Sequence, residues 1–274
     1  MSLVVRSGEL EARLAADERE VRAAQELRYR VFFEEQGAIA DPRTRQRRLD
    51  VDHFDAYADH LVVIDRSRST LLRPAVVGCY RLLRESVALP TVGFYTQAEY
   101  DLGPLLLRTA ETRARGEILE LGRSCVDARY RTGAVMQLMW RAIARYLDEH
   151  RVSVMIGCAS LPGTDVAAVA AQIRWLHEHH LAPLHLRPVA LASRRVAHEP
   201  FAAESFDPHA AFRALPPLVK GYLRLGAMIG EGAVLDEIFN TIDVCIVLPT
   251  DRISAHYRRH FAAQVGERTA TEVA

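Results

Sequence analysis

The sequence predicts a domain of the α/β or α+β type, first from the order of its elements. A helix comes first, two antiparallel strands follow, and the chain then alternates strand, helix, strand, helix and strand. Apolar residues make up 49% and charged residues 26% of the 274, a globular balance with enough apolar surface for a sizeable core. No GxGxxG motif follows an early strand, which argues against a Rossmann fold.

The first half of the chain contains a helix and two strands. Residues 17–36 are predicted to form the helix, because a capping-box pattern opens it and a glycine follows its last apolar position. Residues 38–59 are polar and are expected to form a loop, in which Asp41-Pro42 breaks the chain. Short apolar runs at His60–Asp65 and Ala75–Leu83 predict two strands joined by a long hairpin connection.

The second half alternates strands and helices. Ile118–Val126 and Val152–Cys158 are predicted strands, and an apolar stripe at helical spacing predicts a helix at about 134–150 between them. A further helix is expected at about 165–180. Prolines interrupt the residues after it, and Ile242–Leu248 is predicted to be the last strand.

Charge and cysteine use indicate a cytoplasmic protein. The formal net charge is zero, so no general attraction to nucleic acid or anionic lipid is expected. The four cysteines form no CxxC pair and are interpreted as reduced, buried thiols. The first residues lack a signal-peptide core, and no apolar stretch approaches the roughly 20 residues that span a bilayer.

The first candidate site is the strand-turn-helix segment from Glu120 to Ala134. Glu120 and Arg123 lie on the predicted strand, which leads into a basic turn before the helix. The N-terminus of a helix presents free backbone N–H groups and a positive dipole. With Arg129 and Arg131 beside it, the turn fits a phosphate site, and it fits a solvated loop before a surface helix equally well.

The second candidate site is an acidic loop that carries Asp50, Asp52 and Asp55. These carboxylates could bind a cationic substrate or raise one another's pKa for base chemistry. They could also coordinate a metal, but their spacing fits no EF-hand, and no metal site is predicted. A solvated acidic loop facing the preceding arginines is an equal alternative.

Three further features carry polar groups that could react or bind. Arg81 lies inside an apolar strand and needs a carboxylate partner if it is buried, although an outward-facing arginine is the commoner arrangement. Cys158 and Ser160 lack the GxSxG elbow of a nucleophile. The histidines within 177–180 are expected to complement the C-terminal dipole of their helix rather than to bind metal.

Six sequence blocks, taken in order, resemble one known family. They are Leu27–Phe32, Asp50–Asp55, Gly78–Leu83, Glu120–Arg123, Gly157–Leu161 and Pro216–Ala227. Together they resemble the ornithine N-acyltransferases of bacterial ornithine-lipid synthesis, a branch of the GNAT superfamily, from about residue 20 to about residue 260. The first half is also similar to the acyl-homoserine-lactone synthases.

The resemblance implies a fold and a reaction. The fold is a GNAT-like mixed, mostly antiparallel central sheet flanked by helices. Its strands Ile118–Val126 and Val152–Cys158 would splay apart around the pantetheine arm of a thioester. The reaction would move a 3-hydroxy fatty acyl group from acyl carrier protein to the α-amine of ornithine and give lyso-ornithine lipid, with no further cofactor.

The resemblance also suggests roles for the candidate residues. Glu120 would be the base that deprotonates the amine, with Arg123 as a second catalytic residue. An arginine, either Arg28, Arg81 or Arg123, would bind the carboxylate of ornithine. The ammonium of ornithine would meet the acidic loop, at Asp50, Asp52 or Asp55. Pantetheine and its phosphate would lie against Cys125, Val126, Arg129, Arg131, Gly133 and Ala134.

The turn after the central strand bears on the acyl donor. GNAT enzymes that use coenzyme A typically carry Q/R-x-x-G-x-G/A there, and residues Tyr130–Val135 depart from that pattern. The first position is tyrosine and the final small residue is absent. This departure favours acyl carrier protein, which presents a single phosphate, over coenzyme A.

Three alternatives stay open. An N-acyl amino acid synthase would take another acceptor, such as glycine, lysine or tyrosine. An acyl-homoserine-lactone synthase would use S-adenosylmethionine, but those shorter synthases lack the block at Leu218–Ala227. A regulatory module that binds lipid or carrier protein would be expected to have lost Glu120 or Arg123, and both are present.

The sequence also suggests a division of the chain. Residues 1–182 would form the acyltransferase core, residues 183–262 an extension packed on it, and residues 263–274 a flexible tail. An amphipathic product makes peripheral contact with the inner membrane chemically reasonable. The segment Leu218–Ile229, apolar with two basic residues, could lie on a bilayer or in the core.

Overall fold

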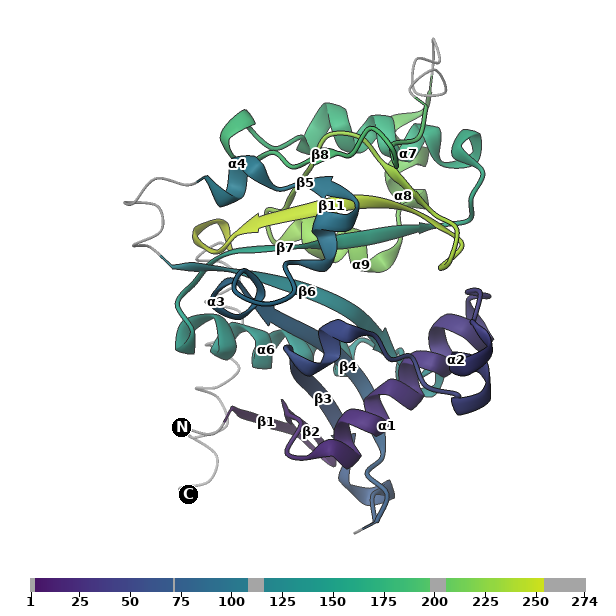
Figure 1. Ribbon diagram of the computed structural model, residues 1–274, viewed down its shortest axis with the longest axis vertical. Coiled ribbons are helices and arrows are strands. Elements are labelled where there is room, and N and C mark those ends of the chain that lie inside the picture. The colour runs from purple at the N-terminus through teal and green to yellow at the C-terminus, as the bar shows by residue number, and fades with distance from the viewer. Residues whose placement is uncertain (1–2, 71, 108–115, 198–205, 254–274) are drawn as a thin grey trace.

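The architecture is a large central sheet with helices on both of its faces (Figure 1). The computed structural model describes residues 3–70, 72–107, 116–197 and 206–253. The described strands form a nine-stranded sheet in the order β1-β2-β3-β4-β6-β7-β11-β10, with β9 also paired to β11. Neighbouring strands of this sheet are antiparallel, except for the parallel pair β6 and β7. The mixed, mostly antiparallel sheet predicted from the sequence is therefore confirmed.

The strands of this sheet differ greatly in length. Their bounds are β1 Val4–Ser7, β2 Leu10–Leu14, β3 Asp59–Asp65, β4 Val76–Arg84, β6 Glu117–Val126, β7 Val152–Pro162, β9 Met228–Ile229, β10 Val234–Asp236 and β11 Thr241–Pro249. Two short strands, β5 (Tyr100–Asp101) and β8 (Val189–Ala190), pair with each other apart from it. Almost every residue of β3, β4 and β11 is buried, as expected for strands covered on both faces.

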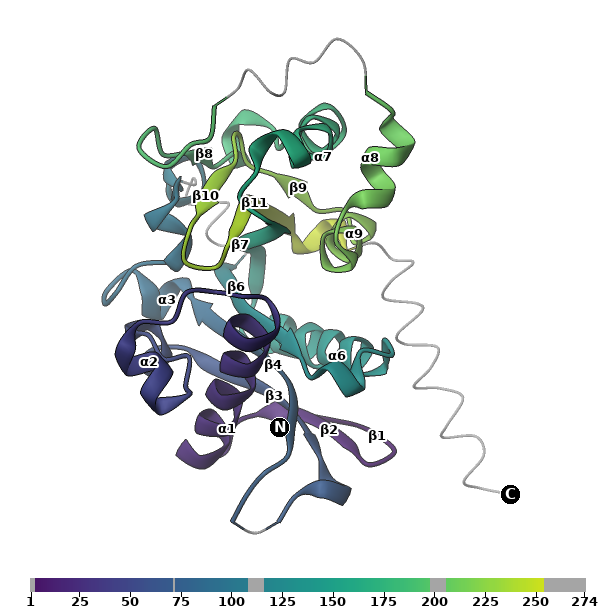
Figure 2. The ribbon, with the colours of Figure 1, turned by 90° about the vertical axis from the view of Figure 1, so that its right-hand side faces the viewer.

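Helices flank both ends of the sheet. Their bounds are α1 Glu18–Tyr29, α2 Pro42–Arg47, α3 Glu85–Ala88, α4 Gly103–Leu106, α6 Ala134–Glu149, α7 Val166–His180, α8 Pro208–Ala214 and α9 Pro217–Arg224. Figure 2 shows α1 and α6 on opposite sides of β3 and β4, and α7, α8 and α9 together at the other end of the molecule. A π-helical turn, Arg30–Glu35, continues α1.

The alternation of side chains along β3 explains why two helices pack there. Val62 and Ile64 belong to the apolar cluster under α1, which also contains Leu27. Leu61 and Val63 belong to the cluster that contains the apolar stripe of α6. Because successive side chains of a strand point to opposite faces, these two pairs bury opposite faces of the same strand.

The prediction of a loop at residues 38–59 is wrong in part. It contains α2 and a 3₁₀ turn, η2 (His53–Ala56). Asp41 does not break the chain but caps α2, since its side chain accepts hydrogen bonds from the backbone N–H groups of Arg43 and Thr44. Proline is well suited to the first position of a helix, so Asp41-Pro42 is a start signal.

Three other segments differ from the sequence prediction or resolve it. The sequence did not predict the N-terminal hairpin of β1 and β2, and β7 continues past its predicted end to Pro162. The segment Leu218–Ile229 divides into α9 and β9, and its apolar side chains are mostly buried in the core. Among the described residues, no helix has the length and apolar character needed to cross a membrane.

The proposed division of the chain stays a prediction. Strands β9, β10 and β11 pair within the same sheet as the strands before residue 182. The tail at residues 263–274 lies outside the described residues.

Strands β6 and β7 pair over a short stretch and then diverge. Their ladder runs from Glu117 opposite Val152 to Glu120 opposite Ile156 and goes no further. At the point of divergence Gly157 packs against β6, where an added Cβ would lie 2.3 Å from the carbonyl oxygen of Leu121. Strand β11 pairs with β7 along its whole length, so β7 keeps its position after it leaves β6.

A β-bulge in β6 lies beside this gap. Across the β4–β6 ladder, Cys79 faces Cys125 and Arg81 faces Gly122, so Arg123 and Ser124 together oppose a single residue of β4. Arg123 has a left-handed backbone, with φ of 51°. A bulge of this kind bends a strand and redirects a side chain, and such strain is commonly found at functional sites.

The close approach at Gly157 can be tested by substitution. Gly157→Ala should lower the free energy of unfolding by about 1–3 kcal/mol, because the new methyl group would overlap the Leu121 carbonyl oxygen and push the strands apart. Gly221→Ala in α9 is the matched control, since a Cβ there meets nothing within 4 Å and alanine favours a helix. Denaturant unfolding of both variants makes the comparison. Equal stability of the two would contradict the steric account.

Candidate active site

A cleft of about 410 Å³ lies where β6 and β7 diverge. Residues 120–124 of β6 line one side, and Cys158, Ala159 and Ser160 of β7 line the other. Asp243 of β11 also lines it. The cleft therefore occupies the gap in which the family resemblance would place the thioester.

Glu120 lies in this cleft and is held tightly. Its side chain is buried, at 4% exposure. One carboxylate oxygen accepts hydrogen bonds from the backbone N–H and the hydroxyl of Thr96, at 2.7 and 2.6 Å, and the other accepts from the backbone N–H of Tyr95, at 2.9 Å. Burial raises the pKa of Glu120, against the lowering effect of the hydrogen bonds from Thr96 and Tyr95.

The predicted arginines and aspartates form one ion-pair network. Arg28 of α1, 1% exposed, donates from Nε to Asp50 at 2.7 Å and from Nη1 to Asp55 at 2.8 Å. Arg81 of β4 donates from Nη1 to Asp52 at 2.6 Å and to Asp55 at 3.2 Å. The buried Arg81 therefore has the carboxylate partners that its position requires.

Arg123 completes this network from the bulge of β6. Its Nη2 donates to Asp52 at 3.1 Å, and its Nε lies 3.1 Å from Asp50 without a hydrogen-bonding angle. The guanidinium also stacks over the ring of Phe239 at 4.6 Å and that of Tyr95 at 5.0 Å. Three arginines and three aspartates thus neutralise one another in the network.

The members of the network differ in their access to the cleft. Arg81 and Arg123 line it. The aspartates and Arg28 lie behind those two arginines and are not among the cleft-lining residues. Burial acts to raise the pKa of Asp55, but Arg28 and Arg81 outweigh it and hold that pKa at about 2, so the carboxylate stays ionised.

The turn between β6 and α6 has its own ion pairs. Arg129 binds Asp127 through Nη2 at 2.7 Å, and Arg131 pairs with Glu35 and donates from Nε to the carbonyl oxygen of Val126 at 3.0 Å. Gly133, with φ of 87°, precedes α6, and no side chain caps that helix. Ala134 is the first residue of α6. The N-terminal N–H groups of a 16-residue helix are thus left for another acceptor.

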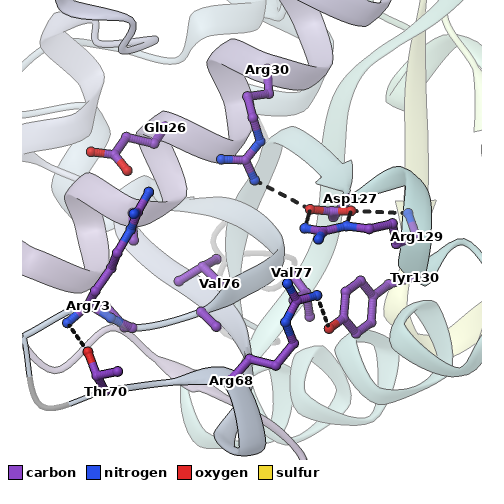
Figure 3. A pocket seen from close by; sticks show the side chains of 13 residues that line it. Glu26, Arg30, Arg68, Thr70, Arg73, Val76, Val77, Asp127, Arg129 and Tyr130 are labelled. Atoms are coloured by element: carbon purple, nitrogen blue, oxygen red, sulfur yellow. Dashed lines mark hydrogen bonds and ion pairs between the residues drawn. The ribbon is translucent and has the colours of Figure 1, made fainter.

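A second hollow of about 420 Å³ lies beside this turn (Figure 3). Four arginines line it, Arg30, Arg68, Arg73 and Arg129, together with two carboxylates, Glu26 and Asp127. Arg30 approaches Asp127 to 3.4 Å, and Arg68 donates to the hydroxyl of Tyr130 at 3.3 Å. The lining carries more positive than negative charge.

The remaining predicted residues lie under α1 and in the central core. Cys125 is buried, with its sulfur 3.5 Å from that of Cys79, and both thiols are free. Val126 is buried in the main core. Their side chains therefore face away from the cleft, and what they offer a ligand is backbone.

Sequence reasoning missed Asp243, which lines the cleft, and Glu99, which lies beside it. Glu99 and Asp243 are buried, at 2% and 5% exposure, and with Cys158 they offer ligand atoms within 4.8 Å of one another. These are the residues in the described part of the chain that could hold a metal ion. The available signal was Asp243 itself, since an aspartate inside an apolar strand needs a partner just as Arg81 does.

Comparison with known proteins identifies the family. A family model described as an acetyltransferase (GNAT) domain matches residues 27–141. The L-ornithine N(alpha)-acyltransferase of Rhodobacter capsulatus is 45% identical, over 94% of this chain and 96% of that protein. The chain belongs to this family of acyltransferases.

A second relative gives the same result. The L-ornithine N(alpha)-acyltransferase of Agrobacterium fabrum is 42% identical, over 94% of this chain and 87% of that protein. Among solved structures, an N-acyl amino acid synthase from uncultured soil microbes is 11% identical, with a TM-score of 0.49, over 91% of this chain and 97% of that chain. The recognition of the family and the prediction of an acyltransferase are confirmed by the sequence relatives.

The ion-pair network should contribute strongly to stability. Arg28→Ala removes the ion pairs at 2.7 Å to Asp50 and at 2.8 Å to Asp55 and leaves the buried network one positive charge short, so the free energy of unfolding should fall by about 3–5 kcal/mol. Arg22→Ala, in the same helix, removes an exposed pair with Glu26 and should cost less than about 1 kcal/mol. Denaturant unfolding measures both. A cost for Arg28→Ala as small as that of the control would show that the network is dispensable.

Proposed function

We propose that this acyltransferase moves a 3-hydroxy fatty acyl group from acyl carrier protein to the α-amine of L-ornithine, giving lyso-ornithine lipid. The acceptor is inferred from the names of the protein's relatives. Their sequences are at least 41% identical to this chain over at least 94% of its length. The observation that carries the proposal is the cleft between the diverging strands β6 and β7, which holds a buried carboxylate and two arginines.

The thioester lies in the gap between the two strands in this proposal. Beyond Glu120 and Ile156, β6 and β7 make no further ladder with each other, so backbone groups on their facing edges are available to a ligand. Pantetheine can take the place of a strand there. A backbone N–H at the same edge can stabilise the oxyanion that forms when the amine attacks the thioester carbonyl.

Glu120 is the proposed base. The ammonium must lose a proton before the amine can attack the thioester carbonyl and form the C–N bond. The oxyanion then collapses, the C–S bond breaks, and the thiolate leaves and takes up the proton that the amine has lost. Three hydrogen-bond donors already occupy the Glu120 carboxylate, but two oxygens offer about four acceptor positions, so one remains for the amine or a bridging water. Its raised pKa makes it a better base than an exposed carboxylate.

Arg81 and Arg123 are the proposed binding groups for the ornithine carboxylate. Both line the cleft, whereas Arg28 does not. Their partners hold them in place: the aspartates Asp50, Asp52 and Asp55 fix the guanidinium groups, and the aromatic rings beside Arg123 hold its plane. In this arrangement the three aspartates act on the substrate through the arginines.

The donor is proposed to be acyl carrier protein. The uncapped N-terminus of α6 suits one phosphate, and the hollow in Figure 3 adds four arginines beside it for an acidic carrier. The turn Tyr130–Val135 lacks the full glycine motif that a pyrophosphate needs. Peripheral contact with the inner membrane, where the product belongs, stays part of the proposal.

The proposal is tested by supplying donors and acceptors in combination. The purified protein is incubated with 3-hydroxyacyl carrier protein or the matching acyl-coenzyme A, together with a panel of amino acids, and the products are read by mass spectrometry. Acyl-ornithine made from the carrier-protein donor is the expected result. Acylation of a different amino acid would correct the acceptor, and transfer from neither donor would reject the proposal.

Substitution of Glu120 tests the base. Glu120→Gln keeps the shape but cannot accept a proton, so kcat should fall by roughly 100-fold or more at neutral pH. The loss should shrink at high pH, where more of the amine is already deprotonated. Asp148→Asn, an exposed change of the same kind on α6, is the control and should keep full activity. Full turnover of Glu120→Gln at every pH would exclude Glu120 as the base.

A further inference from the structure

The acidic groups that line the cleft are not equally available to a substrate. Glu120 accepts three hydrogen bonds from the turn at Tyr95 and Thr96. Asp236 accepts two, from the backbone N–H groups of Ile238 and Phe239. Asp243 differs, because its Oδ1 is buried and has no hydrogen-bond partner among the described residues. A buried carboxylate oxygen left in this state costs free energy unless a ligand completes it.

Glu99 lies beside Asp243 and also has a buried carboxylate oxygen, Oε2, without a hydrogen-bond partner in the described part of the chain. No arginine or lysine of the described residues forms an ion pair with either group, whereas the aspartates of the network have arginine partners. Two neighbouring carboxylates without a counter-ion make this corner of the cleft attractive to a cation.

The position of Asp243 fits the shape of a diamino acid. It lies on β11 directly opposite Ser160 of β7, whereas Arg123 lies on β6. Arg123 and Asp243, whose Oδ1 is without a hydrogen-bond partner within the described residues, therefore line the cleft from different strands. An amino acid whose carboxylate meets Arg123 can extend its side chain toward Asp243, with its α-amine between them at the gap.

We propose that Asp243, supported by Glu99, binds the side-chain ammonium of the acceptor and thereby selects a diamino acid over amino acids with apolar side chains. This proposal rests on the proposed function and adds a specificity residue to it. Asp243 contacts the ammonium, and Glu99 acts through Asp243 as a second negative charge behind it.

Titration of the pair agrees with this role. Burial, with Asp243 as the next cause, raises the pKa of Glu99 to about 7, and burial raises the pKa of Asp243 to about 6. A bound ammonium would favour the ionised forms and compensate both groups. The other groups that act on these two carboxylates are Cys158, Ser160, Arg194, Asp236, Thr241 and Arg123.

The test compares ornithine with norvaline, which has the same carbon chain without the side-chain ammonium. The wild-type protein should prefer ornithine. Asp243→Asn should lower kcat/KM for ornithine by roughly 10- to 100-fold, the loss of one charge-assisted hydrogen bond, and leave norvaline unchanged. Glu99→Gln should act in the same direction with a smaller loss. Asp148→Asn is the control for both.

Two results would overturn the proposal. Equal losses with ornithine and norvaline would give Asp243 a role in the transfer or in the fold, and an unchanged preference for ornithine would remove it from the site. Loss of the preference after treatment with a chelator would assign Glu99, Cys158 and Asp243 to a metal and also reject the ammonium site.

Binding without a donor separates this proposal from the proposed function. Calorimetry should show tighter binding of ornithine than of norvaline to the wild-type protein, and no difference with Asp243→Asn. Selective binding of ornithine without acyl transfer would support the ammonium site. It would contradict only the proposed acyl-transfer reaction. Binding without selectivity would reject the site even if acyl transfer occurred.

The pH dependence gives a further check. Below about pH 6 the pair carries protons, and a cation must displace them to bind. KM for ornithine should therefore fall as the pH rises through 6 to 7, and KM for norvaline should not. The same fall with both acceptors would contradict the assignment.

Discussion

The cleft depends on one network of opposite charges. Arg28, Arg81 and Arg123 come from a helix and two strands, and one acidic loop supplies the carboxylates that join them. The desolvation of six charges is costly, and such a group is stable only when every member is paired. The network thereby fixes α1, the acidic loop, β4 and the bulge of β6 in one arrangement. The left-handed backbone of Arg123 is held by these contacts and by the rings of Tyr95 and Phe239 beside its guanidinium.

Several parts of this arrangement could be predicted from the sequence. The elements around Glu120 follow from apolar periodicity, and an arginine inside an apolar strand predicts a carboxylate partner for Arg81. The pairing of each arginine could not be predicted, since Arg28, the aspartates and Arg123 are far apart along the chain and meet only in the tertiary structure. The sequence analysis interprets the three aspartates as direct ligands of ornithine. That the aspartates lie behind the arginines could not be predicted from the sequence.

Other features were missed for a local reason. Asp41-Pro42 was interpreted as a break because proline usually ends regular structure, although the same pair begins α2. Asp243 was hidden in a run of apolar residues that marks β11 as a strand. Glu99 follows a short 3₁₀ turn with no periodicity, and only the packing of that turn against β7 brings its carboxylate beside Asp243. Asp243 and Glu99 point to a ligand site only because they are buried. Their burial depends on the whole fold and cannot be read from the local sequence.

The order of the strands has a consequence for how the protein is made. Strand β11 is the last long strand of the described chain, yet it lies inside the sheet beside β7 and carries Asp243. Domains form during synthesis as their residues emerge, N-terminal parts first. The ion-pair network and the β6 side of the cleft can assemble early, because their residues precede β7. On the opposite side, the part of β7 beyond Ile156 has no neighbouring strand in the described sheet until β11 has left the ribosome. A nascent chain can therefore complete the network well before it can bind a substrate.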